Sequence, residues 1–160
     1  MMPVPRIHRT RFALSVLAIV LLSSCYSWRR YCLHSYEAVP RQELKASKTV
    51  RRAYVVLLDT DTFEGPFVGF GGAPSRLVCA YEKILQSRDA IPVFKQLLAE
   101  ATLAGQVYAL CGLYVTDRNL YEQKVLDYLK SAEQVSVQYG CEGRLEPVAT
   151  FVREAPAWLD

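Results

Sequence analysis

Two aspartates in the middle of the chain have a spacing that could support acid–base chemistry. Asp59 and Asp61 follow the apolar residues 54–58, and Glu64 lies close behind them. If a strand continued through this stretch, the two aspartates would share one face, and paired carboxylates can hydrolyse glycosides or bind calcium. The calcium-loop template requires an oxygen ligand where Phe63 stands. Because acids that close a strand are commonly turn residues, a hydrolase using Asp59 and Asp61 is the minor hypothesis.

Histidine is scarce in this chain, and its scarcity excludes several kinds of catalytic site. The two histidines are His8, in the basic and apolar N-terminus, and His34, in the polar stretch that follows. If His8 is removed with an export signal, His34 is the one histidine that remains. A Ser/His/Asp or Cys/His catalytic group would then have to recruit His34, and a site with several histidines around one metal ion cannot be built within one chain. We therefore expect no catalytic residue, no metal site and no cofactor.

A glycine-rich stretch carries aromatic residues. Residues 65–74 contain four glycines and two prolines, which predicts a loop. Backbone N–H groups before a helix can bind an anion, but "GFGGAPS" lacks the spacing and the lysine of nucleotide-binding loops, so we expect no nucleotide. Phe63, Phe67 and Phe70 either contact a partner or fold under the loop as a small cluster.

Five cysteines are spread along the chain: Cys25, Cys32, Cys79, Cys111 and Cys141. No two form a CxxC pair, so a thioredoxin-like motif is absent and a paired-knuckle zinc site is not expected. In an exported protein the four that follow Cys25 favour two disulfides, for which three connectivities exist. We predict that Cys111 pairs with Cys141, and Cys32 with Cys79. The alternative is that these cysteines are small buried apolar residues that stay reduced.

The first 24 residues have the anatomy of an export signal. Basic residues precede an apolar run at residues 12–22, and two serines follow it. A membrane-spanning helix needs about 20 apolar residues, so a retained transmembrane segment is the weaker interpretation of this shorter run.

The end of this signal, Leu22-Ser23-Ser24-Cys25, resembles the lipobox of bacterial lipoproteins. The resemblance implies that the thiol of Cys25 is lipidated and that Cys25 becomes the N-terminus. In that family an aspartate after the cysteine favours retention in the inner membrane. Tyr26 stands there, so the resemblance implies the periplasmic face of the outer membrane. The alternative is an ordinary secretory signal with an incidental cysteine.

Removing the signal changes the charge balance. The whole chain has a net charge of +3, and the loss of three signal arginines leaves 16 basic and 16 acidic residues, which gives nucleic-acid binding no electrostatic support. Residues 25–52 form a basic tether, whereas residues 53–160 have a net charge of −5. One interpretation is that the tether lies on anionic headgroups, where each nearby basic residue contributes about 1 kcal/mol of attraction. The other is that the tether is a solvated linker.

Residues 53–160 are long enough for one compact domain. Residues 54–58 are either a buried strand or an apolar segment that lies on helices. Beyond the glycine loop the apolar spacing is helical, with Ser75, Asp89 and Asp117 as N-caps and Gly105 as a break. The helical pattern therefore predicts four helices joined by short connections.

Two helical pairs, at about residues 76–101 and 105–130, resemble HEAT-type repeats in rhythm. The predicted fold class is mainly α, a small bundle of two stacked helical hairpins. Residues 135–141 alternate as a half-buried strand, which could pair with residues 54–58 in a short two-stranded ribbon. A last helical turn is predicted to begin near Pro147.

These observations lead to a binding protein rather than an enzyme. We expect an outer-membrane lipoprotein that faces the periplasm and serves as a binding or scaffolding module of the cell envelope, with an envelope protein as its partner. The alternative is an inhibitor or immunity-type lipoprotein that blocks an enzyme.

Overall fold

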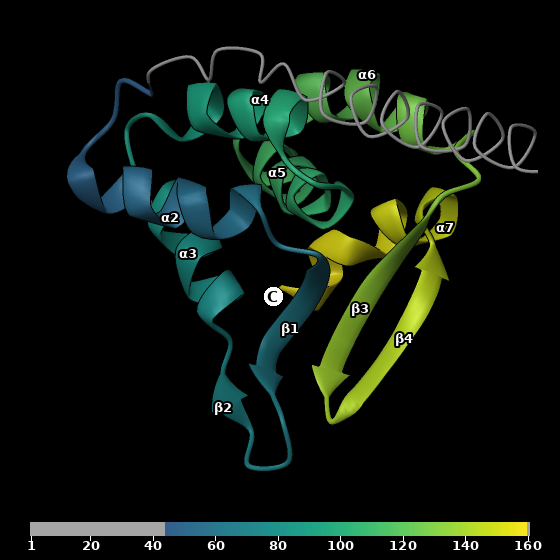
Figure 1. Ribbon diagram of the computed structural model, residues 1–160. Coiled ribbons are helices and arrows are strands. Elements are labelled where there is room, and N and C mark those ends of the chain that lie inside the picture. Colours follow the sequence, from purple (N-terminus) through teal and green to yellow (C-terminus); the bar gives the residue numbers. More distant parts are fainter. Residues whose placement is uncertain (1–43, 160) are drawn as a thin grey trace, which may run out of the picture. The chain divides into compact units, whose positions relative to one another are not determined.

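The computed structural model describes residues 44–159. All described elements belong to one of the chain's two compact units, the unit that spans Glu43–Asp160. Figure 1 shows helices around one end and side of a four-stranded sheet. In chain order the elements are α2 (Lys48–Leu58), β1 (Thr62–Val68), β2 (Ala73–Pro74), α3 (Arg76–Leu85), α4 (Ala90–Glu100), α5 (Leu103–Thr116), α6 (Arg118–Tyr128), β3 (Gln134–Gly140), β4 (Glu142–Pro147), α7 (Val148–Glu154) and the 3₁₀ helix η1 (Ala155–Trp158).

The sheet is mixed, with the strand order β2-β1-β3-β4. Its two central strands, β1 and β3, are parallel, and Phe63 lies opposite Val137 in their register. Each central strand also forms an antiparallel pair with the short or exposed strand that follows it. Since parallel strands require a crossover, helices α3–α6 make the connection between β1 and β3.

This architecture corrects the predicted fold class. A mainly helical bundle with a short ribbon is wrong, because the described residues form an α/β fold with a four-stranded sheet. The strand at residues 134–140 pairs with Thr62–Val68 rather than with residues 54–58. Residues 54–58 are the end of α2, where they continue a buried stripe of helical spacing: Val50, Ala53, Tyr54, Leu57 and Leu58.

The helices also pack differently from two stacked hairpins. Helix α3 packs mainly against α2, and α4 packs mainly against α5, while α3 and α4 have much less contact. Helix α5 is central and is buried on almost every side from Ala104 to Leu113. A helix that is apolar all round belongs in a core, so the bundle is organised around α5 rather than by HEAT-like pairs.

Side-chain caps set the helix starts. As predicted, Ser75 caps α3 and Asp117 caps α6 through hydrogen bonds to backbone N–H groups, whereas Asp89 occupies the N-cap of α4 without such a bond.

Gly105 does not mark a break, because α5 begins two residues earlier and is capped by Thr102. Gly105 instead allows α5 to approach α2, since an added Cβ there would lie 2.2 Å from the Leu57 carbonyl oxygen.

Aromatic side chains join the helices to the sheet. The Phe63 ring stacks on Tyr108 of α5 with the centroids 4.4 Å apart, and it meets Phe151 of α7 edge-on at 5.1 Å. All three residues are fully buried or nearly so. These contacts fix one face of β1 against the helices. Among the described residues, no helix has the length and apolar character needed to cross a bilayer.

Candidate functional site

Two turns lie side by side at one end of the sheet, and the most exposed aromatic residues of the described chain lie in these turns or in the strands beside them. We call Phe67, Phe70, Tyr139 and Cys141 the sheet tip. The turn between β1 and β2 contains Phe70, and the turn between β3 and β4 contains Cys141. Figure 1 shows that both turns lie at the same end of the sheet.

Glycine makes the first turn possible. Gly69 and Gly72 have φ angles of 73° and 61°, in the left-handed region that other residues rarely adopt. The Gly72 N–H donates a hydrogen bond to the Gly69 carbonyl oxygen at 3.1 Å, which closes the turn. Phe70 therefore sits at the apex of a defined turn.

A hydrogen bond joins the two turns. The Gly69 N–H donates to the Gly140 carbonyl oxygen at 2.8 Å, and Val68 is aligned with Gly140 in the β1–β3 register. Gly140 also has a positive φ, of 56°. Phe67 and Tyr139 each lie one residue before this alignment, on neighbouring strands. The sheet tip is thus one connected surface rather than two separate loops.

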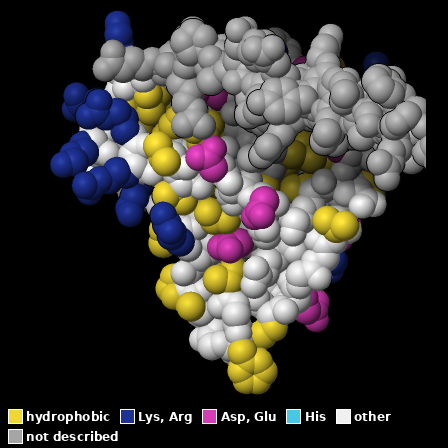
Figure 2. All heavy atoms as spheres, in the orientation of Figure 1, with side chains coloured by type: hydrophobic (Ala, Val, Ile, Leu, Met, Phe, Trp, Pro, Cys, Tyr) yellow, Lys and Arg dark blue, Asp and Glu magenta, His cyan; other side chains and the backbone are white. Residues whose placement is uncertain are grey.

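The aromatic side chains of the sheet tip are open to solvent. Phe70 is 100% exposed, Phe67 59% and Tyr139 60%. Figure 2 shows a hydrophobic side chain protruding at the lower end of the molecule. Burying a phenylalanine side chain is worth about 1.5–3 kcal/mol, and this stabilisation is not gained within the domain. Clustered exposed apolar residues are typical of interaction sites.

Contacts with Gly65 and Trp158 hold the ring of Tyr139 in place. Its ring covers Gly65, where an added Cβ would lie 2.6 Å from the Tyr139 Cδ2 atom. The ring also meets Trp158 of η1 edge-on with the centroids 5.5 Å apart, and Trp158 in turn contacts Phe151. A contact residue that is already positioned loses less entropy on binding.

The structure separates the three predicted partner-contact residues. Phe63 is fully buried between α5 and α7, so its role is structural. Phe67 and Phe70 are exposed and remain candidates, whereas the sequence interpretation missed Tyr139. Strict alternation along residues 135–141 suggested that Tyr139 was buried. The signal that could have revealed it is its position immediately before a Gly-Cys turn.

The paired carboxylates do not form the predicted acidic face. Asp59 is the C-cap of α2, and Asp61 is an exposed residue just before β1, so no strand runs through them. The Asp61 carboxylate accepts a hydrogen bond from the Thr62 hydroxyl at 3.2 Å. Within residues 44–159 no group of three or more His, Cys, Asp or Glu side chains has the arrangement to hold a metal ion.

The N-terminus of α3, which follows the glycine stretch, is already satisfied by side chains. The Ser75 hydroxyl accepts hydrogen bonds from the N–H groups of Leu77 and Val78, both at 3.1 Å, and it donates to the Glu64 carboxylate at 2.6 Å. Glu64 supplies the negative charge that favours a helix N-terminus. The glycine stretch itself is the β1–β2 hairpin rather than an irregular loop.

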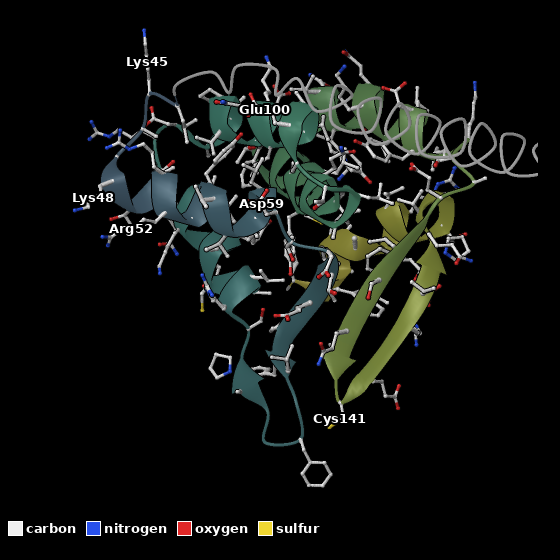
Figure 3. The ribbon with its side chains drawn as sticks, viewed as in Figure 1. Lys45, Lys48, Arg52, Asp59, Glu100 and Cys141 are labelled. Atoms are coloured by element: carbon white, nitrogen blue, oxygen red, sulfur yellow. The ribbon has the colours of Figure 1, made fainter. Side chains whose placement is uncertain are left out.

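The predicted disulfide between Cys111 and Cys141 is not formed in the structure. Cys111 is buried in α5, and burial raises the pKa of its thiol, whereas Cys141 is exposed at the sheet tip (Figure 3). Cys79 is a half-buried free thiol on α3. Its predicted partner Cys32 lies outside the described residues, as do Cys25, the lipobox and His34.

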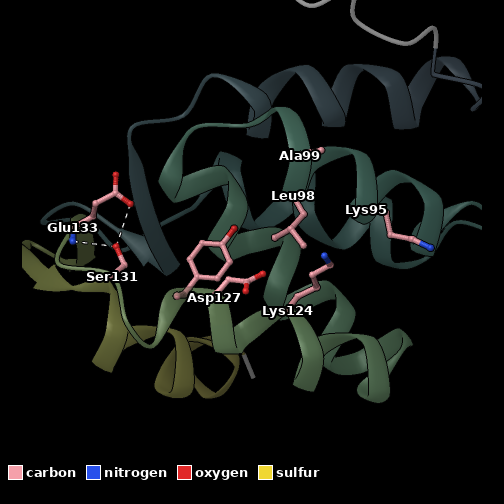
Figure 4. A pocket seen from close by; sticks show the side chains of 8 residues that line it. Lys95, Leu98, Ala99, Lys124, Asp127, Ser131 and Glu133 are labelled. Atoms are coloured by element: carbon pink, nitrogen blue, oxygen red, sulfur yellow. Dashed lines mark hydrogen bonds between the residues drawn. The ribbon is translucent and has the colours of Figure 1, made fainter.

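A pocket of about 370 Å³ lies between α4, α6 and the segment that leads to β3 (Figure 4). Its lining mixes two lysines, Lys95 and Lys124, with acidic and apolar side chains. The Tyr128 hydroxyl donates to Gln106 at 2.7 Å, and burial, followed by the nearby Asp127 and Glu133, raises the pKa of Tyr128 to about 12. A neutral tyrosine and balanced charges favour neither an anion nor a cation there.

The chain was compared with protein families, curated proteins and solved structures. No protein-family model, no curated protein and no solved structure matches the chain.

Proposed function

We propose that this protein is a binding module of the bacterial cell envelope, anchored through a lipid on Cys25 in the outer membrane and facing the periplasm. In this proposal the sheet tip docks an apolar pocket of another envelope protein. The observation that carries this proposal is that Phe70 is fully exposed at the apex of a turn. Gly69 and Gly72 shape this turn, and the hydrogen bond from Gly69 to Gly140 holds it in place.

Three features of the sheet tip support docking. Aromatic residues at protein interfaces supply much of the binding energy when they enter a pocket of the partner. Phe70 protrudes alone, so it has the form of such an anchor, while Phe67 and Tyr139 provide flanking apolar surface. The positioned ring of Tyr139 and the joined turns reduce the ordering that binding would require.

The same protrusion supports the second candidate, an inhibitor or immunity-type lipoprotein. A single exposed aromatic side chain on a narrow turn has the form to enter the substrate pocket of an enzyme. In that case the partner is a hydrolase, and stoichiometric addition of this protein abolishes its activity. A scaffolding partner is instead bound without any loss of enzymatic activity.

The test is site-specific photo-crosslinking in the bacterial cell. A photoreactive phenylalanine analogue replaces Phe70 in the full chain, and in a matched strain it replaces Val115, which is 59% exposed at the end of α5. We expect one defined protein adduct from position 70 and none from position 115. Mass spectrometry of the adduct then identifies the partner.

The purified partner gives the quantitative test. Phe70→Ala is expected to weaken its binding about 30-fold, the effect of a hot-spot residue worth about 2 kcal/mol, while Val115→Ala leaves the affinity unchanged. The double substitution Asp59→Asn with Asp61→Asn is also expected to leave binding unchanged, because neither residue belongs to the sheet tip. Equal affinity of the Phe70→Ala variant and the wild type would refute docking through this surface.

A further inference from the structure

The exposed face of α2 is strongly basic. Its solvent stripe consists of Lys48, Arg51, Arg52 and Val55, spaced at i, i+3, i+4 and i+7, and Lys45 lies just before the helix. No acidic residue occurs within α2, and among residues 44–159 these four basic side chains form no ion pair. Figure 2 shows the resulting cluster of basic side chains on one side of the molecule.

This basic face is rigidly mounted on the domain. The opposite side of α2 is buried through Val50, Tyr54 and Leu57, and the Tyr54 hydroxyl donates to the Glu100 carboxylate of α4 at 2.7 Å. Lys48, Arg51 and Arg52, which the sequence interpretation assigned to the tether, therefore belong to a folded helix. Whatever these side chains bind also fixes the orientation of the whole domain.

We propose that the α2 basic face lies on anionic phospholipid headgroups and sets the orientation of the domain at the membrane. Clusters of basic side chains are attracted to anionic headgroups, and Val55, which is 55% exposed, lies among them on this face. Residues 53–160 have a net charge of −5, so the positive charge of the domain is concentrated on this face. The inference rests on the membrane attachment of the proposed function and adds the surface that faces the bilayer.

The length of the preceding chain permits this contact. Eighteen residues separate Cys25 from Leu44, and a chain of that length reaches at most about 60 Å when fully extended. Lys48 thus begins its helix within reach of a lipid on Cys25. Each basic residue near an anionic membrane adds attraction that reinforces the acyl chains.

The contact would leave the sheet tip accessible to a partner. Figure 3 shows Lys45, Lys48 and Arg52 around the start of α2, and Cys141 at the far end of the sheet. If α2 faces the bilayer, the turn that carries Phe70 lies outside the contact, because the basic side chains lie along one flank of the domain and the sheet tip is at its lower end (Figure 2). The basic face and the aromatic tip then have separate tasks, with the first holding the domain and the second meeting the partner.

The test measures lysine acetylation on the full chain. Protein purified from membranes in detergent is reconstituted into nanodiscs of phosphatidylcholine, alone or mixed with phosphatidylglycerol, and a water-soluble acetylating reagent is applied. Mass spectrometry gives the rate at each lysine. Lys45 and Lys48 report on the basic face, and the exposed Lys124 and Lys130, on and after α6, are internal controls.

We expect acetylation of Lys45 and Lys48 to slow about threefold or more in the anionic discs, and salt to abolish this protection. Lys124 and Lys130 should react equally in both discs. Arg51→Glu with Arg52→Glu should remove the protection, while the matched reversal Lys124→Glu with Lys130→Glu should leave it intact.

Each other outcome has a defined meaning. Attachment to both kinds of disc without selective protection overturns the headgroup contact and leaves the lipid anchor standing. Attachment to anionic discs alone supports the headgroup contact and contradicts the anchor. A chain that attaches to neither kind of disc overturns both the headgroup contact and the lipid anchor.

Discussion

The Tyr108 hydroxyl makes the two backbone hydrogen bonds to Glu64 that a neighbouring strand would otherwise make. It accepts a hydrogen bond from the Glu64 N–H and donates one to the Glu64 carbonyl oxygen, both at 2.9 Å. Strand β2 pairs with β1 only at Phe67 and Val68, so within residues 44–159 the earlier part of β1 has no neighbouring strand on that side. A side chain from α5 thus completes the hydrogen bonding of a strand edge.

Removing this hydroxyl should destabilise the domain. Tyr108→Phe keeps the buried ring and its stacking on Phe63 but leaves the N–H and C=O of Glu64 without this partner. An unsatisfied polar group inside a protein costs about 1–3 kcal/mol. For a domain of this size each kcal/mol lowers the melting temperature by about 4–8 °C, which circular dichroism would detect.

The control for this experiment is Tyr139→Phe. The side chain of Tyr139 is mostly exposed, so water replaces any partner of its hydroxyl, and we expect a change in stability within about 0.5 kcal/mol. If Tyr108→Phe is as stable as the wild type, the hydroxyl is not completing the edge of β1.

A second prediction concerns the close approach of α5 to α2. Replacing a helical glycine with alanine usually stabilises a helix by about 0.5–1 kcal/mol. At Gly105 the effect should be reversed, because the new Cβ would lie 2.2 Å from the Leu57 carbonyl oxygen. Backbone shifts of this kind cost about 1–3 kcal/mol or more. Denaturant unfolding of Gly105→Ala measures the loss.

Gly71→Ala provides the comparison, since no atom of the described residues lies within 4 Å of an added Cβ there. Its stability should equal that of the wild type or exceed it slightly. A stabilised Gly105→Ala variant would mean that α5 and α2 are further apart than the structure has them.

The helical part of the fold was predictable because its signals are local. Ser75 and Asp117 cap helices through their own side chains, and the apolar spacing that follows each of them has a helical period. Residues 54–58 were ambiguous, because a short apolar run fits a strand or a buried helix equally well. Only their position after the stripe from Val50 identifies the end of α2.

The sheet was harder to predict because its strands contradict strand propensities. Gly65 and Pro66 lie inside β1, and both residue types usually interrupt strands. Gly65 is required because the Tyr139 ring covers it, a contact between residues far apart in sequence. Strand β4 is polar and exposed along most of its length, so it lacks the alternation that marks a half-buried strand. The sheet tip arises from this long-range pairing.

A third prediction distinguishes free thiols from the disulfide that cysteine counting suggested. With iodoacetamide and no reductant, Cys141 should be alkylated rapidly in the folded protein, because it is exposed. Cys111 should react only after unfolding, since it is buried and burial raises the pKa of its thiol. Peptide mass spectrometry reads both sites. A Cys141 that resists alkylation, together with a linked Cys111–Cys141 peptide in the non-reduced digest, would instead show that bridge.

The fourth prediction concerns the membrane anchor. Chain purified from bacterial membranes should have lost residues 1–24 and should begin with Cys25 carrying a diacylglyceryl group, as the Leu22-Ser23-Ser24-Cys25 sequence implies. Cys25→Ala removes the thiol that would be lipidated, so this variant should carry no lipid and should keep its signal. The control Cys32→Ala retains Cys25 and should be lipidated normally. Intact and peptide mass spectrometry of the three proteins measures both events. An unmodified N-terminus in the wild type would replace the lipid anchor with an ordinary secretory signal.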